Sequence, residues 1–416
     1  MADSADVAAR PAAVDRAAHR DPNVLRWLGA YASSAIGDNV YYLALSWAAV
    51  QAGTPAQAGL VTALSAVPRA VLMLGGGVIA DRFGPRRVLI SSDAVRCAAV
   101  LAVAGLLLVG RPGLWPLAVL ALVFGAVDAV MMPALGALPT RMTGRGQLAR
   151  VHGMRGLVVR LANVLGAPLG GLGVALGGTA AAFGLAGLLF AASLPLLIAV
   201  RVAEQPADDA RVRGTAWSDL TGGLRYVRGH RVLRSLIVVI ALSDLGFVGP
   251  LNVGLVLLAD ERGWGAGGVG WVLAGFGTGA GAASLLLTAR GRVPRAGFVL
   301  SVSGVVSAVA IAALAYLPHV AVAVAVALSI GLISGLNGVL CGALLQAESD
   351  RAYVGRVTSV SNFFSLGVAP LTFPLTGAAI GLWGTGPVFV ASAVVCGLGG
   401  VAGLCARDLR RAELPR

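Results

Sequence analysis

Gly77-Val-Ile-Ala-Asp81-Arg82-Phe83-Gly84-Pro85-Arg86-Arg87 joins two long apolar segments of the chain. Its last seven residues contain one carboxylate, three guanidinium groups and a Gly-Pro turn. The sequence on either side is apolar enough for hydrocarbon, so these charges must lie at a membrane surface, where water solvates them. The stretch therefore predicts a loop between two membrane-spanning helices.

The composition of the whole chain agrees with that interpretation. Of its 416 residues, 57% are hydrophobic and only 12% are charged, whereas soluble domains carry about 25% charged residues. The net charge of +13 is typical of nucleic-acid partners, but every basic residue is an arginine, and the arginines cluster between apolar segments. We therefore expect a lipid bilayer as the surroundings and no nucleic acid as a partner.

Apolar runs of spanning length can be counted along the chain, each bounded by charges or by Gly/Pro turns. We predict an all-α integral membrane protein with twelve spans at about 25–50, 56–80, 87–109, 114–138, 148–175, 179–202, 232–258, 266–288, 296–317, 319–344, 356–380 and 386–406. The predicted parts are an N-terminal tail (1–24), two six-helix halves (25–202 and 232–406), a central loop (203–231) and a C-terminal tail (407–416).

The arginines predict the orientation of these spans. If the first span leaves the cytoplasm, the inner segments hold 26 of the 32 arginines, the outer loops hold two, and four lie within spans. By the positive-inside rule, both tails are then cytoplasmic, in a multi-pass protein of the cell membrane.

The two halves repeat each other at one ungapped offset of 206 residues. Gly136-Ala-Leu recurs as Gly342-Ala-Leu, Pro168-Leu recurs as Pro374-Leu, and Asp38 recurs as Asp244. Parallel six-span repeats occur in a class of secondary transporters that bind substrate between the halves, near the membrane midplane.

In this context the opening stretch resembles the signature loop of the major facilitator superfamily. The residues that carry the resemblance are Gly77, Asp81, Arg82, Gly84, Arg86 and Arg87. The resemblance implies that Gly77 permits close approach of span eleven, that Asp81 faces the N-terminus of that span, and that the arginines hold a closed inner gate. A carboxylate is stabilised by the unpaired amides and the dipole of a helix N-terminus.

Further motifs are similar to the branch that contains siderophore and macrolide exporters. They include Asp93-Ala-Val-Arg96 in span three, Gly222-Gly-Leu-Arg-Tyr-Val-Arg228 in the central loop, and Val354-Gly-Arg356-Val before span eleven. We expect Asp93, Arg96 and Arg356 to support the gate. Span five carries Gly166, Pro168, Gly170 and Gly171, which resemble the glycine-proline motif of antiporters.

Five charged residues are expected deep in the membrane, where ionised groups are costly unless they are paired or hydrated. These residues are Asp38, Asp128, Asp244, Arg69 and Arg160. One hypothesis is proton coupling or substrate contact; the alternative is mutual pairing that only holds helices together. The aromatic residues Tyr41, Tyr42 and Phe247 either line an apolar cavity or serve in packing.

Together these patterns favour a secondary transporter that exports a small, partly apolar compound by proton antiport. The alternatives are uptake or facilitated diffusion of a metabolite, and a membrane sensor or assembly protein that kept the fold. We expect no enzymatic activity, no cofactor and no metal, because no nucleophile–base pair, P-loop or cluster of metal ligands stands out. We expect a monomer.

Overall fold

The computed structural model describes residues 18–110, 112–201, 216–290, 293–350 and 353–413, and every long element in these ranges is a helix. The side chains of residues 18, 70, 73–78, 80–81, 145, 149, 216–220, 288–290 and 366–369 lie outside the description. The predicted fold class, an all-α membrane protein of twelve spans, is confirmed.

The first half is built from six helices. They are α1 (Pro22–Ala52), α2 (Pro55–Leu64), α3 (Ala66–Phe83), α4 (Pro85–Val109), α5 (Trp115–Met142) and α6 (Leu148–Ala199), with 3₁₀ turns at Ala18–Arg20 and Arg145–Gln147. Prolines at the first positions of α1, α2 and α4 favour helix starts, because they have no amide hydrogen to leave unpaired there.

The second half follows the helix α7 (Ala216–Gly229). Its helices are α8 (Arg231–Gly249), α9 (Leu255–Glu261), α10 (Gly265–Arg290), α11 (Ala296–Leu314), α12 (Val320–Ala347), α13 (Val354–Asn362), α14 (Thr372–Trp383), α15 (Thr385–Cys405) and α16 (Arg407–Arg411). A π-helical segment (Pro250–Gly254) joins α8 to α9; a second one (Phe363–Val368) and a 3₁₀ turn (Ala369–Leu371) join α13 to α14.

Several spans are interrupted helices. Within the described residues, eight helical stretches are long and apolar enough to cross a membrane. One of them, Arg150–Ala199, has 50 residues, so it must cross a hydrocarbon layer of about 30 Å twice. It turns at Gly177 and Gly178, where the positive φ of 70° at Gly178 suits glycine. The other three spans are α1, α2 with α3, and α13 with α14.

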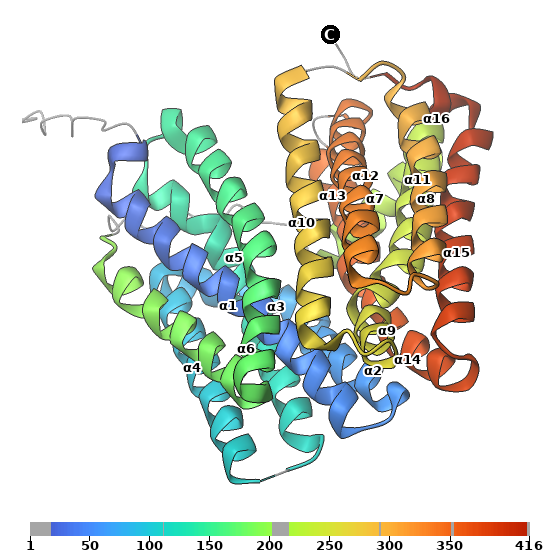
Figure 1. Cartoon of the computed structure of the whole chain (residues 1–416). Helices are drawn as coiled ribbons and strands as arrows, with labels where there is room; N and C mark the ends of the chain where they lie inside the picture. The colour runs from blue at the N-terminus through green and yellow to red at the C-terminus, as the bar shows by residue number, and fades with distance from the viewer. Residues whose placement is uncertain (1–17, 111, 202–215, 291–292, 351–352, 414–416) are drawn as a thin grey trace, which may run out of the picture.

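The two halves contact each other more closely at one end of the bundle than at the other. The start of α1 and the end of α16 lie at one end, which we call the terminal end, and the halves diverge toward it (Figure 1). At the opposite end Gln51 donates a hydrogen bond of 2.8 Å to Asp260, which joins the ends of spans one and seven.

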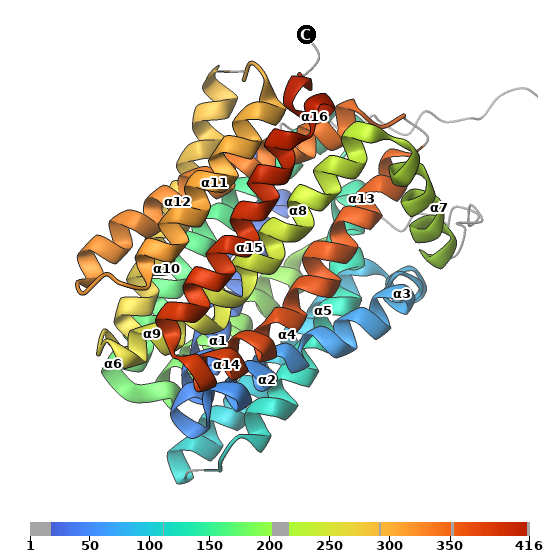
Figure 2. The same cartoon turned by 90° about the vertical axis from the view of Figure 1, so that its right-hand side faces the viewer.

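Glycines bring helices of different halves into contact. Helix α2 lies beside α14 (Figure 2), and a Cβ atom on Gly59 would stand 2.5 Å from the carbonyl oxygen of Phe373. On the other side of the bundle, a Cβ on Gly171 of α6 would stand 2.6 Å from the carbonyl oxygen of Ala266 in α10. Any larger side chain at these glycines would force the halves apart.

The loop between α3 and α4 is a tight turn. Gly84 has a positive φ of 80°, and Pro85 starts α4. Arg86 donates hydrogen bonds to the carbonyl oxygens of Leu197 (3.2 Å) and Ile198 (2.5 Å) at the end of α6. Arg86 thus satisfies carbonyls that the last turn of a helix leaves unpaired.

The remaining loop residues are Gly77, Asp81, Arg82 and Arg87. The surroundings of Gly77 and of the Asp81 side chain lie outside the description. The expected contacts of these two residues with span eleven therefore remain predictions. Arg82 and Arg87 are exposed.

Helix α7 packs against α13 (Figure 2). A Cβ on Gly223 would stand 2.5 Å from the carbonyl oxygen of Arg356, so the glycine lets α7 contact the α13 backbone. The guanidinium of Arg356 lies 5.4 Å from the ring centre of Tyr353. The Arg356 side chain, at the start of span eleven, therefore lies beside α7.

Candidate functional site

A cavity of about 840 Å³ lies between the two halves. Its wall includes Tyr42 of α1, Arg69 of α3 and Arg160 of α6 from the first half, and Phe276 of α10 from the second. It extends to the exposed His152 in the first turns of α6, at the terminal end. A volume of this size suits a drug-sized molecule.

One face of α6 forms the polar wall of the cavity. His152, Arg155, Arg160 and Asn163 all line it, together with small and apolar residues of the same face. Their spacing follows the helical repeat of 3.6 residues, which places them in one stripe. Asn163 accepts a hydrogen bond of 3.3 Å from Asn39 of α1.

The second half supplies a mainly apolar wall. Among its described lining residues, only Asn252 and Ser284 have polar side chains. The large apolar groups are Leu251, Leu273 and Phe276; small residues of α10 lie beside them. The cavity therefore has one polar wall and one apolar wall.

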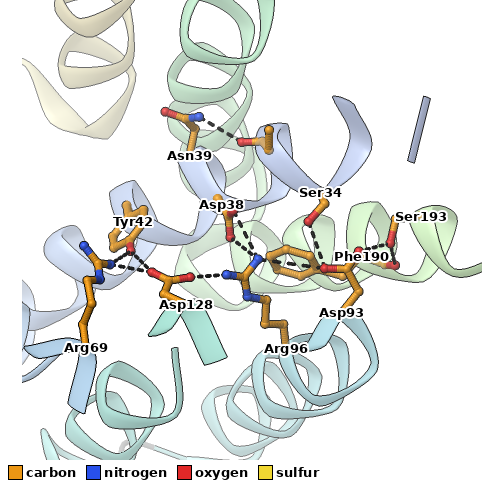
Figure 3. Close-up of polar contacts among 11 residues, drawn as sticks. Ser34, Asp38, Asn39, Tyr42, Arg69, Asp93, Arg96, Asp128, Phe190 and Ser193 are labelled. Atoms are coloured by element: carbon orange, nitrogen blue, oxygen red, sulfur yellow. Dashed lines mark hydrogen bonds and ion pairs between the residues drawn. The ribbon is translucent and has the colours of Figure 1, made fainter. Parts of the chain in front are cut away.

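The first half also holds a buried network of charges, contributed by α1, α3, α4 and α5 (Figure 3). Arg69 is 2.5 Å from the carboxylate of Asp128, and the side chains are 23% and 8% exposed. The Tyr42 hydroxyl donates a hydrogen bond of 3.1 Å to Asp128 and accepts one of 2.9 Å from Arg69. Because Arg69 and Tyr42 also line the cavity, the network forms part of the cavity surface.

Arg96 of α4 is the centre of this network. It is fully buried, donates a hydrogen bond to Asp128, and lies 3.2 Å from Asp38 and 3.9 Å from Asp93. Its guanidinium also packs over the rings of Phe124 and Phe190 (5.4 and 5.8 Å to the ring centres). One buried cation thus faces carboxylates from α1, α4 and α5.

Asp93 joins the network to two other helices. Its carboxylate accepts a hydrogen bond of 2.9 Å from Ser34 of α1 and another from Ser193 of α6. Asp93 and Arg96 were expected to support the gate. The structure places both in the buried network of Asp38 and Asp128.

Asp38 has the weakest hydrogen bonding of the three carboxylates. Arg96 donates one long hydrogen bond of 3.3 Å to its Oδ2 atom. The Oδ1 atom is buried and, within the described residues, receives no hydrogen bond. Asp38 is therefore the carboxylate that an added proton would disturb least.

The second half has no equivalent of this network at the repeated positions. Asp244, the counterpart of Asp38, accepts a hydrogen bond from Ser365 in the π-helical segment of span eleven. The positions that correspond to Arg69 and Arg96 at the offset of 206 are Gly275 and Val302. The repeat thus preserves the aspartate and not its cationic partners.

The expected cavity aromatics have different surroundings. Tyr42 lines the cavity, whereas Tyr41, for which packing was the alternative, is fully buried and stacks on Phe124 with 3.6 Å between ring centres. Tyr41 therefore faces α5 and serves in packing. Phe247 is also outside the cavity wall; it packs 5.6 Å from Phe276, which takes that place.

The span-five motif packs α6 against two helices. A Cβ on Gly170 would stand 3.2 Å from the backbone of Val40 in α1, and one on Gly166 would stand 2.4 Å from the Cβ of Asn39 in the same helix. Gly171 and Pro168 face α10 of the other half; a Cβ on Gly270 there would stand 3.1 Å from Pro168. The motif therefore lies where the halves meet.

Sequence reasoning missed several cavity residues, among them His152, Arg155, Asn39 and Asn252. The stripe of polar residues on one face of span five was the available signal. Among the described residues, no group of three or more His, Cys, Asp or Glu side chains could hold a metal ion.

Comparisons with known proteins agree with this geometry. The sequence profile of the Major Facilitator Superfamily matches residues 27–372. The multidrug efflux pump Tap of Mycobacterium tuberculosis is 29% identical over 396 residues, covering 87% of this chain and 88% of that protein. The enterobactin exporter EntS of Escherichia coli is 26% identical over 346 residues, covering 82% and 80%.

Solved structures share the fold. The nucleoside transporter NupG superposes with a TM-score of 0.72 at 10% identity, covering 93% of this chain and 100% of that one. A bacterial homologue of the lysosomal transporter Spinster, in an inward-facing and occupied conformation, superposes with a TM-score of 0.69 at 14% identity, covering 94% and 98%. The chain belongs to the Major Facilitator Superfamily, and it is a membrane transporter and not an enzyme.

Proposed function

We propose that this transporter exports a small, partly apolar compound in exchange for protons, by alternating access of its two halves. The observation that carries the proposal is the charge balance of the buried network. Asp38, Asp93 and Asp128 face only Arg69 and Arg96 among the described residues. When all five groups are ionised, the network has one uncompensated negative charge, which one proton would neutralise.

Asp38 is the proposed proton carrier. An uncompensated charge costs several kcal/mol in a buried site. Asp128 is bonded to two arginines and a tyrosine, and Asp93 to two serines. The Asp38 side chain is 24% exposed, so water can reach it in part.

Arg69 is the proposed link between the proton and the substrate. It lines the cavity and also binds Asp128, which shares Arg96 with Asp38. A substrate that presses Arg69 onto Asp128 would free Arg96 to pair with Asp38. Arg96 would then stabilise ionised Asp38 more, which favours release of its proton, as exchange of substrate for a proton requires.

The moving units are the six-helix halves, residues 25–202 and 232–406, in a protein that works as a monomer. The Gly77–Arg87 loop closes the terminal end in the alternate state, and both tails lie in the cytoplasm of a cell whose inner or plasma membrane holds the protein. Export is the favoured direction because Tap is named as an efflux pump and EntS as an exporter.

The test uses inverted membrane vesicles from cells that overproduce the protein, and a panel of radiolabelled antibiotics and metabolites. Acidifying the lumen should drive uptake of at least one compound, and an uncoupler should abolish that uptake. Vesicles without the protein are the control. Accumulation that persists with the uncoupler would refute antiport, and uptake only down the compound's own gradient would indicate facilitated diffusion.

A further inference from the structure

The cavity wall carries positive charge without matching negative charge. Three arginines line it, Arg69, Arg155 and Arg160, and none of the described lining residues is an aspartate or a glutamate. Arg69 is neutralised from behind by Asp128. Arg155 and Arg160 have no carboxylate at salt-bridge distance within the part of the chain that the structure describes.

The surroundings of these two arginines leave them available to a ligand. Arg160 donates a hydrogen bond of 3.3 Å to the carbonyl oxygen of Gly281 in α10, which leaves most of its guanidinium donors free of described partners. Arg155 lies five positions earlier on the same wall of α6. Unpaired cations within a membrane protein are costly, and an anion in the cavity would offset that cost.

The apolar wall limits what this anion can be. Leu251, Leu273 and Phe276 lie in the wall of the second half, opposite the stripe of α6. A small inorganic anion would leave these groups facing water, while an apolar body would cover them. The volume of about 840 Å³ has room for both an acidic group and a ring system.

We propose that the substrate is an amphiphilic organic anion, with its acidic group held by Arg155 and Arg160 and its apolar body on the Phe276 wall. This inference rests on the proposed function, because it takes the cavity as the substrate site. A cation of the same shape would meet two like charges and no carboxylate in the described wall. Charge is therefore the basis of selection among compounds of one size.

The test compares three probes that share one ring system: 1-pyrenebutyrate, the neutral 1-pyrenebutanol and the cationic 1-pyrenebutylamine. Binding to purified protein in a neutral detergent is measured by titration, with empty micelles as the blank. Pyrenebutyrate should bind at least about tenfold more tightly than the alcohol, because a hydrogen bond to a charged group contributes about this much. The amine should bind most weakly.

Arg155→Gln and Arg160→Gln should each weaken pyrenebutyrate binding about tenfold and leave the affinity for pyrenebutanol unchanged. Arg160→Lys should retain the preference for the anion. Arg234→Gln is the matched control, because Arg234 is exposed on α8 and absent from the cavity wall.

The inference is overturned if the amine binds as tightly as the butyrate, if both glutamine variants keep the preference, or if none of the probes binds. Because the titration uses no proton gradient, its outcome is independent of coupling. Selective anion binding without proton-driven transport would refute only antiport; proton-driven transport without anion selectivity would refute only this inference.

Discussion

Replacing Arg96 with methionine removes the central cation of the buried network. Methionine fills a similar volume and packs against Phe124 and Phe190, so the change tests charge more than shape. Asp38 and Asp93 would lose their only described cationic partner, and Asp128 would keep Arg69. The Arg96→Met protein should therefore be strongly destabilised.

The size of the effect follows from burial. Arg96 is fully buried, and the Asp93 and Asp128 side chains are 3% and 8% exposed. Removing one partner of a buried ion pair costs about 3–5 kcal/mol, since the remaining charge is left uncompensated. Asp128→Asn removes one of the three negative charges, so it should offset part of that loss in the double variant.

The assay is denaturant unfolding in mixed micelles for Arg96→Met, Asp128→Asn and the double variant. Each variant should lower the free energy of unfolding. For the double variant the decrease should be at least about 1 kcal/mol smaller than the sum of the two single decreases, as expected for residues in contact. Arg231→Met, an exposed change on α8, should cost less than about 0.5 kcal/mol. Losses that add to within about 0.5 kcal/mol would refute the coupled network.

Three further predictions concern other parts of the transporter. Tyr42→Phe removes the hydroxyl between Arg69 and Asp128, so stability in the same unfolding assay should fall by about 1 kcal/mol; an unchanged midpoint would contradict that bond. Gly171→Val places a side chain against the Ala266 carbonyl, so export should drop several-fold with membrane insertion intact, whereas normal export would show that this contact is dispensable. Asp81→Ala should keep the membrane topology, as measured by cysteine labelling, and lose transport. An unimpaired transport rate would indicate that the loop only anchors the helices at the membrane surface.

The sequence predicted the fold well, because spans and the loops between them depend on local properties. Hydrophobic length located all twelve spans, although their interruptions were missed. The π-helical segments at Pro250–Gly254 and Phe363–Val368 depend on packing between helices, which local hydrophobicity does not encode. The predicted boundary between the spans at 148–175 and 179–202 coincides with the turn at Gly177 and Gly178.

The site was predicted in part. Their position in apolar spans identified Asp38, Asp128 and Arg69 as charges within the membrane, where ionised groups are costly. Pairing of such charges was one of the alternatives, and the structure shows Arg69 paired with Asp128. Which arginine joins the aspartates depends on the rotation of each helix, so Arg96 was assigned to the gate although it is the centre of the network. Whether these charges move protons remains a proposal.

The most direct test of the account compares wild-type protein with Asp38→Asn in proteoliposomes, using a compound that the vesicle screen identifies. The variant should lose accumulation driven by a pH gradient and keep exchange of labelled for unlabelled compound, because its cavity remains intact and only the proposed proton carrier is missing. Asp408→Asn, an exposed change on α16, is the control that should retain both activities. Accumulation by Asp38→Asn at the wild-type rate would contradict the account.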